Sequence, residues 1–529
     1  MADQSSAEYR EREDKYDVDP DFVLPDLAPA LPPGGRIETT ELRLTSTYYD
    51  TAAADLRRNR LTLRRREGDA DTGWHLKLPA SKSTDNARTE IRVADAAELP
   101  AELARVLTGV RRGADLVPVA RLDVRRTARR LLGADADLLA EVADDSVDAT
   151  DLSAGGTAPG GPVAAAHWRE VEVEAGPAAA PAAASADRAA QAAGRSPAES
   201  DDDPAERLLA TVGAALTAAG ARASQSASKL SRALGPTAQR PSLDSDSTLA
   251  DLVSDYIATQ CAVIVAGDLG VRLGRDVIHP TRVAIRRLRS TLRTFAPLFD
   301  VSAAAALEAE LVWFAGLLGG VRDADVLRLR LDRLVAGLPP ELVLGPVAAR
   351  IDHQLAAERA EHWRELNAAL DSQRLLDLLG VLEQWRLAPP FVDQAKGPVD
   401  SVPARRVTKY LTRSRHKLDR RLEWAAQPGP DQEMLVHRAR KAGKRFRYAA
   451  ELAEPVLGTK ASDQAAEAEA LQDLLGEHQD SVVSVAALRR FGAAAGTTPG
   501  ENGFTFGILL EAELRRGAQI RAQIAGGGT

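Results

Sequence analysis

Two patterns of hydrophobic and polar residues divide the chain. Up to about residue 175, apolar and polar residues alternate with a period of two, and from about residue 247 apolar residues recur every three or four positions. Leu61 and Leu63, for example, share one face of an extended strand, whereas Arg64 and Arg66 share the other. The alternation recurs in five further segments, 74–78, 87–93, 119–126, 138–145 and 168–174. The first part is therefore predicted to be an antiparallel sheet and the second part all-helical.

The charged faces of the predicted strands are sorted by sign. Carboxylates lie in the first strand, at Glu11 and Glu13, and in the last, at 170–174, whereas bases such as Arg64 and Lys77 lie in the middle strands. A sheet with one face in water explains any one of these strands. It does not explain the sorting, which favours a closed barrel with a charged lumen.

The helical part contains a basic strip. Written as a helix, one face of the segment 279–293 carries five basic residues: His279, Arg282, Arg286, Arg289 and Arg293. Leu288 and Leu292 lie on another face, which is apolar. The segment is therefore predicted to be a helix with one core face and one cationic face.

This basic helix returns later in the chain. The segment from His437 matches it with Arg440, Lys444 and Arg447, and Leu-Gly-x-x-x-Asp follows each copy, at 318–323 and 475–480. Such a repeat indicates a duplicated helical unit. Separate helices are expected at 303–319 and 322–335.

The basic segments predict a polyanion partner. Residues 438–447 hold six Lys or Arg and no acid, in a chain whose formal net charge is -8. A third basic helix, 405–421, carries Arg413 and Lys417 on one face, for which a solvated surface and a ligand surface are equally good interpretations. The basic helices show little aromatic interleaving, so nucleic acid is an unlikely partner.

Composition predicts a reducing compartment and several domains. The 529 residues exceed a single core, and one cysteine, Cys261, excludes a disulfide framework. The N-terminus lacks signal-peptide features and no apolar run reaches membrane-spanning length, so a cytoplasmic protein is expected. We predict a first domain over 1–234 with an Ala/Pro-rich insertion at about 175–203, a linker over 235–246 and a helical domain over 247–529.

The strand region resembles a known family. Its motifs are Glu11-x-Glu13-x-Lys15, Tyr48-Tyr49-Asp50-Thr51, Leu63-Arg64-Arg65-Arg66, Lys77, Arg88-x-Glu90 and Glu170-x-Glu172-x-Glu174. In this order, over about 8–232, they are similar to CYTH domains, the triphosphate tunnel metalloenzymes. One departure is Asp123, which lies between Arg121 and Arg125 where the family usually has paired bases.

The resemblance implies a phosphate chemistry and its residues. A linear triphosphate would be held by Lys15, Arg64, Arg66, Lys77, Arg88 and Arg125. Mg²⁺ or Mn²⁺, which prefer carboxylate oxygens, would be held by Glu11, Glu13, Asp145, Glu170 and Glu172, with Asp144 and Glu174 as near alternatives. The substrate stays open among tripolyphosphate, thiamine triphosphate, nucleotides and long-chain polyphosphate.

The helical region, over about 245–490, resembles a CHAD domain, a family that binds inorganic polyphosphate. The residues expected to bind it are His279, Arg282, Arg286, Arg289, Arg293, Arg413, Lys417, His437, Arg440, Lys444 and Arg447. The expected fold is α+β, an N-terminal antiparallel β-barrel (tunnel) domain followed by an all-α duplicated helical bundle. The leading hypothesis is a metal-dependent inorganic triphosphatase with a polyphosphate-binding domain. The alternative is a non-catalytic polyphosphate-binding, granule-associated protein, which Asp123 favours.

Overall fold

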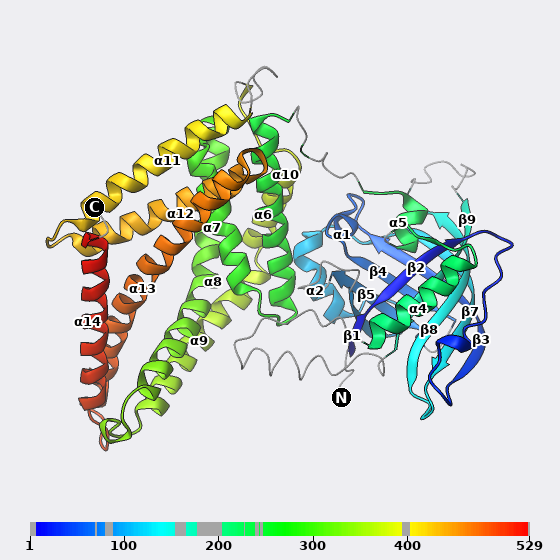
Figure 1. Ribbon diagram of the computed structural model, residues 1–529, viewed down its shortest axis with the longest axis horizontal. Coiled ribbons are helices and arrows are strands. Elements are labelled where there is room, and N and C mark those ends of the chain that lie inside the picture. Colours follow the sequence, from blue (N-terminus) through cyan, green and yellow to red (C-terminus); the bar gives the residue numbers. More distant parts are fainter. Residues whose placement is uncertain are drawn as a thin grey trace. The chain divides into compact units, whose positions relative to one another are not determined.

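The computed structural model divides into two units, Met1–Gln239 and Arg240–Thr529 (Figure 1). The structure describes residues 7–68, 71–79, 88–153, 165–176, 204–226, 228–237, 243, 247–393 and 403–526. Most of the predicted insertion and linker lies outside these residues. The side chains of Glu11 and Arg88 also lie outside the description, although their backbones are strands.

The first unit is one antiparallel sheet. Its strands are β1 (Ala7–Glu11), β2 (Glu13–Val18), β3 (Arg36–Asp50), β4 (Thr62–Glu67), β5 (Gly73–Pro79), β6 (Arg88–Ala94), β7 (Val117–Leu132), β8 (Leu138–Asp151), β9 (Ala165–Ala175) and β10 (Arg222–Ala223). Their order is β1-β6-β5-β4-β3-β7-β8-β9-β2-β10. Only Arg12 separates β1 from β2, although these strands lie near opposite ends of that order. The sheet therefore curls until its ends approach.

The curled sheet does not close completely. Among the described residues, no hydrogen-bonded ladder joins β1 to β2 or β10, so the predicted barrel is a strongly curved open sheet. Helix α4 (Pro204–Ala218) covers its outer face, where Leu209 and Val212 pack on Val142 and Val173. Two further helices, α1 (Asp55–Arg58) and α2 (Ala101–Arg111), pack on each other. The inner face is left to charged side chains and one short helix.

That short helix, α5 (Lys229–Leu234), fills part of the interior with apolar side chains. Leu230 joins a buried cluster with Val124, Val147 and Trp168, all from inward-facing strand positions. The Ser228 side chain caps the helix by accepting a hydrogen bond from the Ser231 amide. One part of the interior is thus a packed core, and only the remaining part is open for a ligand.

The second unit is all-helical. Its helices are α6 (Leu249–Arg272), α7 (Ile278–Thr294), α8 (Val301–Ala336), α9 (Val347–Leu370), α10 (Gln373–Leu387), α11 (Pro403–Ala426), α12 (Gln432–Leu457), α13 (Thr459–Ala495) and α14 (Phe504–Gly526). Successive helices pack on each other from α6 to α9 and again from α11 to α14, and α7 contacts α12. The two helices with the basic strips, α7 and α12, are each the second helix of their series. This equivalent position confirms the predicted duplication.

Helix α8 is continuous where the sequence predicted two helices, and that prediction was wrong. A glycine inside a helix costs only about 1 kcal/mol, which packing over 36 residues outweighs. At Gly320 an added Cβ would lie 2.5 Å from the His362 ring of α9, so the glycine permits close helix packing.

Two helices, α6 and α8, are long and apolar enough to cross a membrane by length and composition alone. The most apolar stretch of α6 is 56% buried, and that of α8 is 22% buried. Both helices pack within this bundle, and α8 carries Glu308 and Glu310, which pair with Arg293 and Arg374. Core helices of soluble bundles meet the same criterion, so it does not assign a membrane segment.

Candidate functional site in the curved sheet

Charged side chains on the inner face of the sheet surround a cavity of about 280 Å³. Because side chains alternate between the two faces of a strand, every second residue of the motif strands reaches it. The charged lining residues are Glu13, Lys15, Arg64, Arg66, Asp71, Lys77, Arg92, Arg126, Glu141, Glu172, Glu174 and Lys229. Six of the sequence-predicted residues are therefore brought together: Glu13, Lys15, Arg64, Arg66, Lys77 and Glu172.

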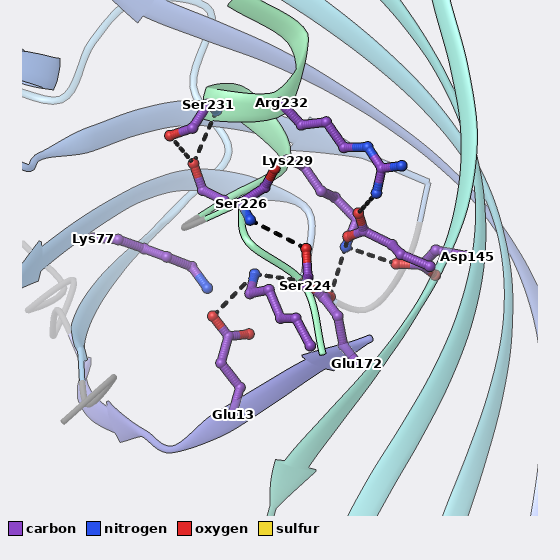
Figure 2. A network of polar contacts seen from close by, with 12 residues as sticks. Glu13, Lys77, Asp145, Glu172, Ser224, Ser226, Lys229, Ser231 and Arg232 are labelled. Carbon is purple, nitrogen blue, oxygen red and sulfur yellow. Dashed lines mark hydrogen bonds and ion pairs between the residues drawn. The ribbon is translucent and has the colours of Figure 1, made fainter. Parts of the chain in front are cut away.

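An acidic cluster lies beside the cavity. Asp145, Glu170 and Glu172 offer oxygens that all lie within 4.8 Å of one another. Asp145 and Glu170 are directly opposite in the β8–β9 register, where two like charges destabilise a sheet unless a cation compensates them. Lys229 supplies that cation, with its Nζ 2.9 Å from Asp145 and 2.7 Å from both Glu170 and Glu172 (Figure 2).

Lys15 on β2 also neutralises carboxylates. Its Nζ lies 2.7 Å from Glu172, its neighbour across the β2–β9 pair, and 3.2 Å from Glu13. Burial would raise the pKa of Glu172, but Lys15 and Lys229 outweigh it and hold that pKa well below its usual range. The pKa of Asp145 is likewise lowered, against its burial, by Lys229 and Arg126. These carboxylates are therefore ionised near neutral pH.

Bases on β4, β5 and β6 form the opposite wall and are organised by Glu90. This fully buried carboxylate accepts hydrogen bonds from Arg64 at 3.3 Å and Arg92 at 2.5 Å, and contacts His75 at 3.0 Å. Burial alone would raise its pKa, but the hydrogen bond to His75 and the charge of Lys77, 3.8 Å away, lower it strongly. Glu90 thus holds the bases in place.

Strand β7 contributes a different arginine from the predicted one. The Arg125 side chain is 70% exposed, pairs with Asp148 and does not line the cavity. The next residue, Arg126, points inward and contacts Asp145 at 2.7 Å and Glu172 at 3.1 Å. The sequence analysis had chosen Arg125, whereas the structure places Arg126 in the cavity lining. Two adjacent arginines occupy opposite faces of a strand, and the alternation alone does not show which of these faces points inward.

Asp123 shares the outward face with Arg125. It accepts a hydrogen bond from Thr45 at 2.6 Å, pairs with Arg121 at 3.2 Å, and lies outside the cavity lining. The inward position between Leu122 and Arg126 is Val124, part of the apolar cluster around α5. Asp123 therefore does not interrupt the basic wall, although this strand contributes one inner base instead of a pair.

The Tyr-Tyr-Asp-Thr motif has two separate roles. The buried Tyr48 lines the cavity, whereas Asp50 turns away and accepts backbone hydrogen bonds from Leu56 and Arg57. These bonds hold the turn into α1, so half of the motif is structural. Sequence reasoning had not separated these halves, and it had also left Lys229 and Arg126 out of the site.

The donor set of the acidic cluster suits a divalent cation. Hard ions such as Mg²⁺ and Mn²⁺ take carboxylate oxygens, and Asp145, Glu170 and Glu172 provide three carboxylates close together. Glu13, linked to Glu172 through Lys15, lines the adjacent cavity wall. The residues present therefore fit a metal, provided that Lys229 gives way to it.

In the helical unit, both copies of the repeat converge on one cationic cluster. The charge of Lys444 is destabilised by burial and by Arg440, Arg286 and Arg282, which together lower its pKa to about 7. The Nε atoms of Arg286 and Arg440 are buried without a hydrogen-bond partner among the described residues. Each repeat contributes one acid to this cluster. Asp323 of the first repeat pairs with Arg282 at 2.7 Å, and Asp480 is the corresponding acid of the second repeat.

A second cationic cluster continues along the same helices and includes α11. Arg293, Arg413, Lys417 and Arg445 line a pocket of about 440 Å³ between α7, α11 and α12. Burial, with the charges of Arg445, Arg421 and Arg420, lowers the pKa of Lys417. Glu308 is the nearby acid, 3.6 Å from Arg289 and also paired with Arg293.

Three residues that were predicted to bind polyphosphate, Arg447, His437 and His279, have surroundings that differ from those of the other predicted residues. Arg447 pairs with Glu451 at 2.9 Å and Glu469 at 2.8 Å, so its charge is already neutralised, and Arg445 faces the second cluster instead. His437 contacts Gln479 at 2.9 Å. His279 is exposed at the start of α7, near Arg322.

A curved antiparallel sheet around a cavity of bases and carboxylates, joined to a duplicated basic helical bundle, defines the class of this protein. A CYTH family model matches residues 35–201, and a CHAD family model matches 255–489. The chain belongs to the family of proteins that fuse a CYTH domain to a CHAD domain. Its first unit is therefore a triphosphate-tunnel domain of the hydrolase or cyclase kind.

Two proteins of Mycobacterium tuberculosis are similar to this chain over nearly its whole length. Uncharacterized protein MT2285 (strain CDC 1551 / Oshkosh) and uncharacterized protein Rv2226 (strain ATCC 25618 / H37Rv) are each 34% identical over 98% of this chain and 95% of theirs. Among solved structures, PptA from Streptomyces chartreusis is 20% identical, with a TM-score of 0.43, over 53% of this chain and 99% of that one. A putative adenylyl cyclase from Hippeastrum, whose title describes a dominant triphosphatase activity, is 16% identical, with a TM-score of 0.21, over 43% and 97%.

Proposed function

We propose that the first unit hydrolyses inorganic triphosphate, or a related linear triphosphate, with Mg²⁺ or Mn²⁺, and that the helical unit binds polyphosphate. The observation that carries the first half is the cavity itself. Bases from β2, β4, β5 and β7 face it together with carboxylates from β2, β8 and β9. Phosphoanhydride cleavage needs both, because positive charge must surround the transferred phosphoryl group and carboxylates must hold a metal.

In this proposal the bases bind and orient the substrate. Arg64, Arg66 and Lys77 neutralise the phosphate oxygens from one wall, and Arg126 with Lys229 does so from the other. Asp145, Glu170 and Glu172 would hold a divalent cation, which would supply further neutralising charge and lower the pKa of a nearby water. Hydrolysis adds the oxygen of a water molecule to the terminal phosphorus as the bridging P–O bond breaks. Phosphate and diphosphate leave, and the water proton passes to solvent.

The helical unit is proposed to bind long-chain polyphosphate through its two cationic clusters. Its support is the clustering of bases. Among the described residues, the buried Nε atoms of Arg286 and Arg440 have no hydrogen-bond partner, and Asp480 and Asp323 are the acids whose charges act on Arg440. A polyanion removes this repulsion. Such binding would recruit a cytoplasmic enzyme to polyphosphate granules.

The alternative of a non-catalytic binding protein rested on Asp123, which lies outside the cavity lining. No observation now favours it over catalysis. Phosphate release by the purified full-length protein from tripolyphosphate, thiamine triphosphate, ATP and long-chain polyphosphate, with and without Mg²⁺ or Mn²⁺, tests the proposal. Metal-dependent release from at least one linear triphosphate is expected, and no release from any of them would refute the catalytic half.

A further inference from the structure

Lys229 lies where a metal ion would lie in the acidic cluster. Its ammonium contacts Asp145, Glu170 and Glu172 within 2.9 Å, and its side chain is only 9% exposed. In the part of the chain that the structure describes, these three carboxylates bring their oxygens close enough together to share one cation. An ammonium and a divalent cation cannot both use this set at these distances without strong repulsion.

We propose that Lys229 is a positioning residue that excludes divalent cations from the acidic cluster until a phosphate chain enters the cavity. In the resting protein its ammonium neutralises the carboxylates. When substrate arrives, the ammonium moves onto phosphate oxygens and the metal takes its place. This inference rests on the proposed function, because it takes the cavity to be the site of metal and triphosphate.

The charges around the cluster support this exchange. Lys229 contacts all three carboxylates, Arg126 contacts Asp145 and Glu172, and Lys15 contacts Glu172. Arg232 also lies 3.7 Å from Glu170, so each of the three carboxylates is already paired with at least one cation. A divalent ion alone would add further positive charge to this cluster. A triphosphate brings the negative charge that makes all of these cations favourable. Metal and substrate are therefore expected to bind cooperatively.

The position of Lys229 also allows the movement. It is the first residue of α5, directly after the cap Ser228. Both residues line the cavity, and Lys229 also contacts the carboxylates of the cluster (Figure 2). A lysine side chain is a flexible stem with a compact charge at its end. The ammonium can therefore turn from the carboxylates toward the cavity while α5 and its apolar contacts, such as Leu230 with Trp168, stay in place.

The test is a titration of the full-length protein with Mn²⁺ in the absence of phosphate. The EPR signal of free Mn²⁺ measures how much of the metal remains unbound. Lys229→Met should bind its first Mn²⁺ about ten-fold more tightly than the wild type, because the competing charge is gone. Lys229→Arg keeps the charge and should restore the weak binding. Lys77→Met is the matched control, since Lys77 lines the same cavity but lies 3.8 Å from Glu90, and it should change Mn²⁺ affinity by less than about three-fold.

The outcomes separate this inference from the proposed function. Unchanged or weaker Mn²⁺ binding by folded Lys229→Met overturns the inference alone, because Lys229 would then be a structural ion-pair partner. If no protein binds Mn²⁺ and none releases phosphate from triphosphates, the proposed function fails as well. Should Lys229→Met not fold, Lys229→Gln, which keeps hydrogen-bond donors, is titrated instead, and Mn²⁺ should raise its melting temperature more than that of the wild type.

Discussion

The cavity of the sheet and the basic surface of the helices are both cationic, but their charges are balanced differently. In the cavity, lysines face carboxylates, so the pKa of Lys229 is raised, despite its burial, by Glu172 and Asp145. On the helices, bases face bases, so the pKa of Lys444 is lowered by burial and by Arg440. The opposite pKa shifts of the buried Lys229 and the half-buried Lys444 distinguish a site where carboxylates outweigh the burial of a lysine from one where neighbouring bases add to the effect of burial.

Under the proposed function, this difference corresponds to two kinds of phosphate binding. The cavity would exchange internal ion pairs for contacts with metal and substrate, which suits a site that releases its products. The helical surface would take an external anion that relieves repulsion between its bases, which suits stable retention of a long polymer.

The largest effect is expected in the cavity. Glu13→Gln should reduce metal-dependent turnover by about a hundred-fold or more, because the carboxylate that pairs with Lys15 and faces the cavity is lost. Phosphate release at saturating Mg²⁺ measures this loss. The metal-free melting temperature serves as the control and should change little. Wild-type turnover in this variant would remove Glu13 from the site.

Two adjacent arginines provide a matched pair on β7. Arg126→Met should lower turnover by roughly ten- to a hundred-fold, because it removes an inner base that contacts Asp145 and Glu172. Arg125→Met should change turnover by less than about two-fold, because Arg125 is 70% exposed and pairs with Asp148. A larger loss of turnover in Arg125→Met than in Arg126→Met would show that Arg125, and not Arg126, faces the cavity from β7.

On the helical surface, charge reversal should affect binding rather than turnover. The double variant Arg286→Glu, Lys444→Glu should weaken long-chain polyphosphate binding by roughly a hundred-fold at low salt and reduce the salt dependence, because fewer phosphates are contacted. Titrations at two salt concentrations measure both quantities. Triphosphate hydrolysis by the same variant should be nearly unchanged, and a parallel loss would indicate that the two units are coupled.

A smaller effect is expected from pH. Lys444, with a pKa of about 7 before binding, is largely neutral at pH 8 and must take up a proton to contact phosphate. Affinity for polyphosphate should therefore fall by up to about ten-fold per pH unit above pH 7 and be nearly constant below it. The groups whose charges act on Lys444 are Arg282, Arg286, Arg440 and Asp480.

Lys444→Arg is the control for this pH dependence, because an arginine stays charged over the whole range. Its polyphosphate affinity should be flat between pH 6 and 9. Internal phosphates of a long chain are strongly acidic and do not titrate there. A wild-type affinity that is flat above pH 7, or a Lys444→Arg profile that falls in parallel, would place the proton elsewhere.

Much of this organisation could be predicted from local periodicity. The period-two alternation identified the inward residues of β2 and β4, because a pleated strand sends every second side chain to one face. The three- to four-residue spacing on α7 and α12 identified the basic strips and their repetition, because helical faces recur with that period. Both patterns can be recognised in a short stretch of sequence, without knowledge of tertiary contacts.

The remaining features depend on residues far apart in the chain. Lys229 lies 57 positions after Glu172, and only the curvature of the sheet and the placement of α5 bring them within 2.7 Å. The choice between Arg125 and Arg126 follows from the register of β7 with β8, and the continuity of α8 from the packing of Gly320 against His362. The sequence by itself determined which residue types line each face. Which cation neutralises which carboxylate was decided by tertiary structure, because ion pairing falls off within a few ångströms and those distances exist only in the folded chain.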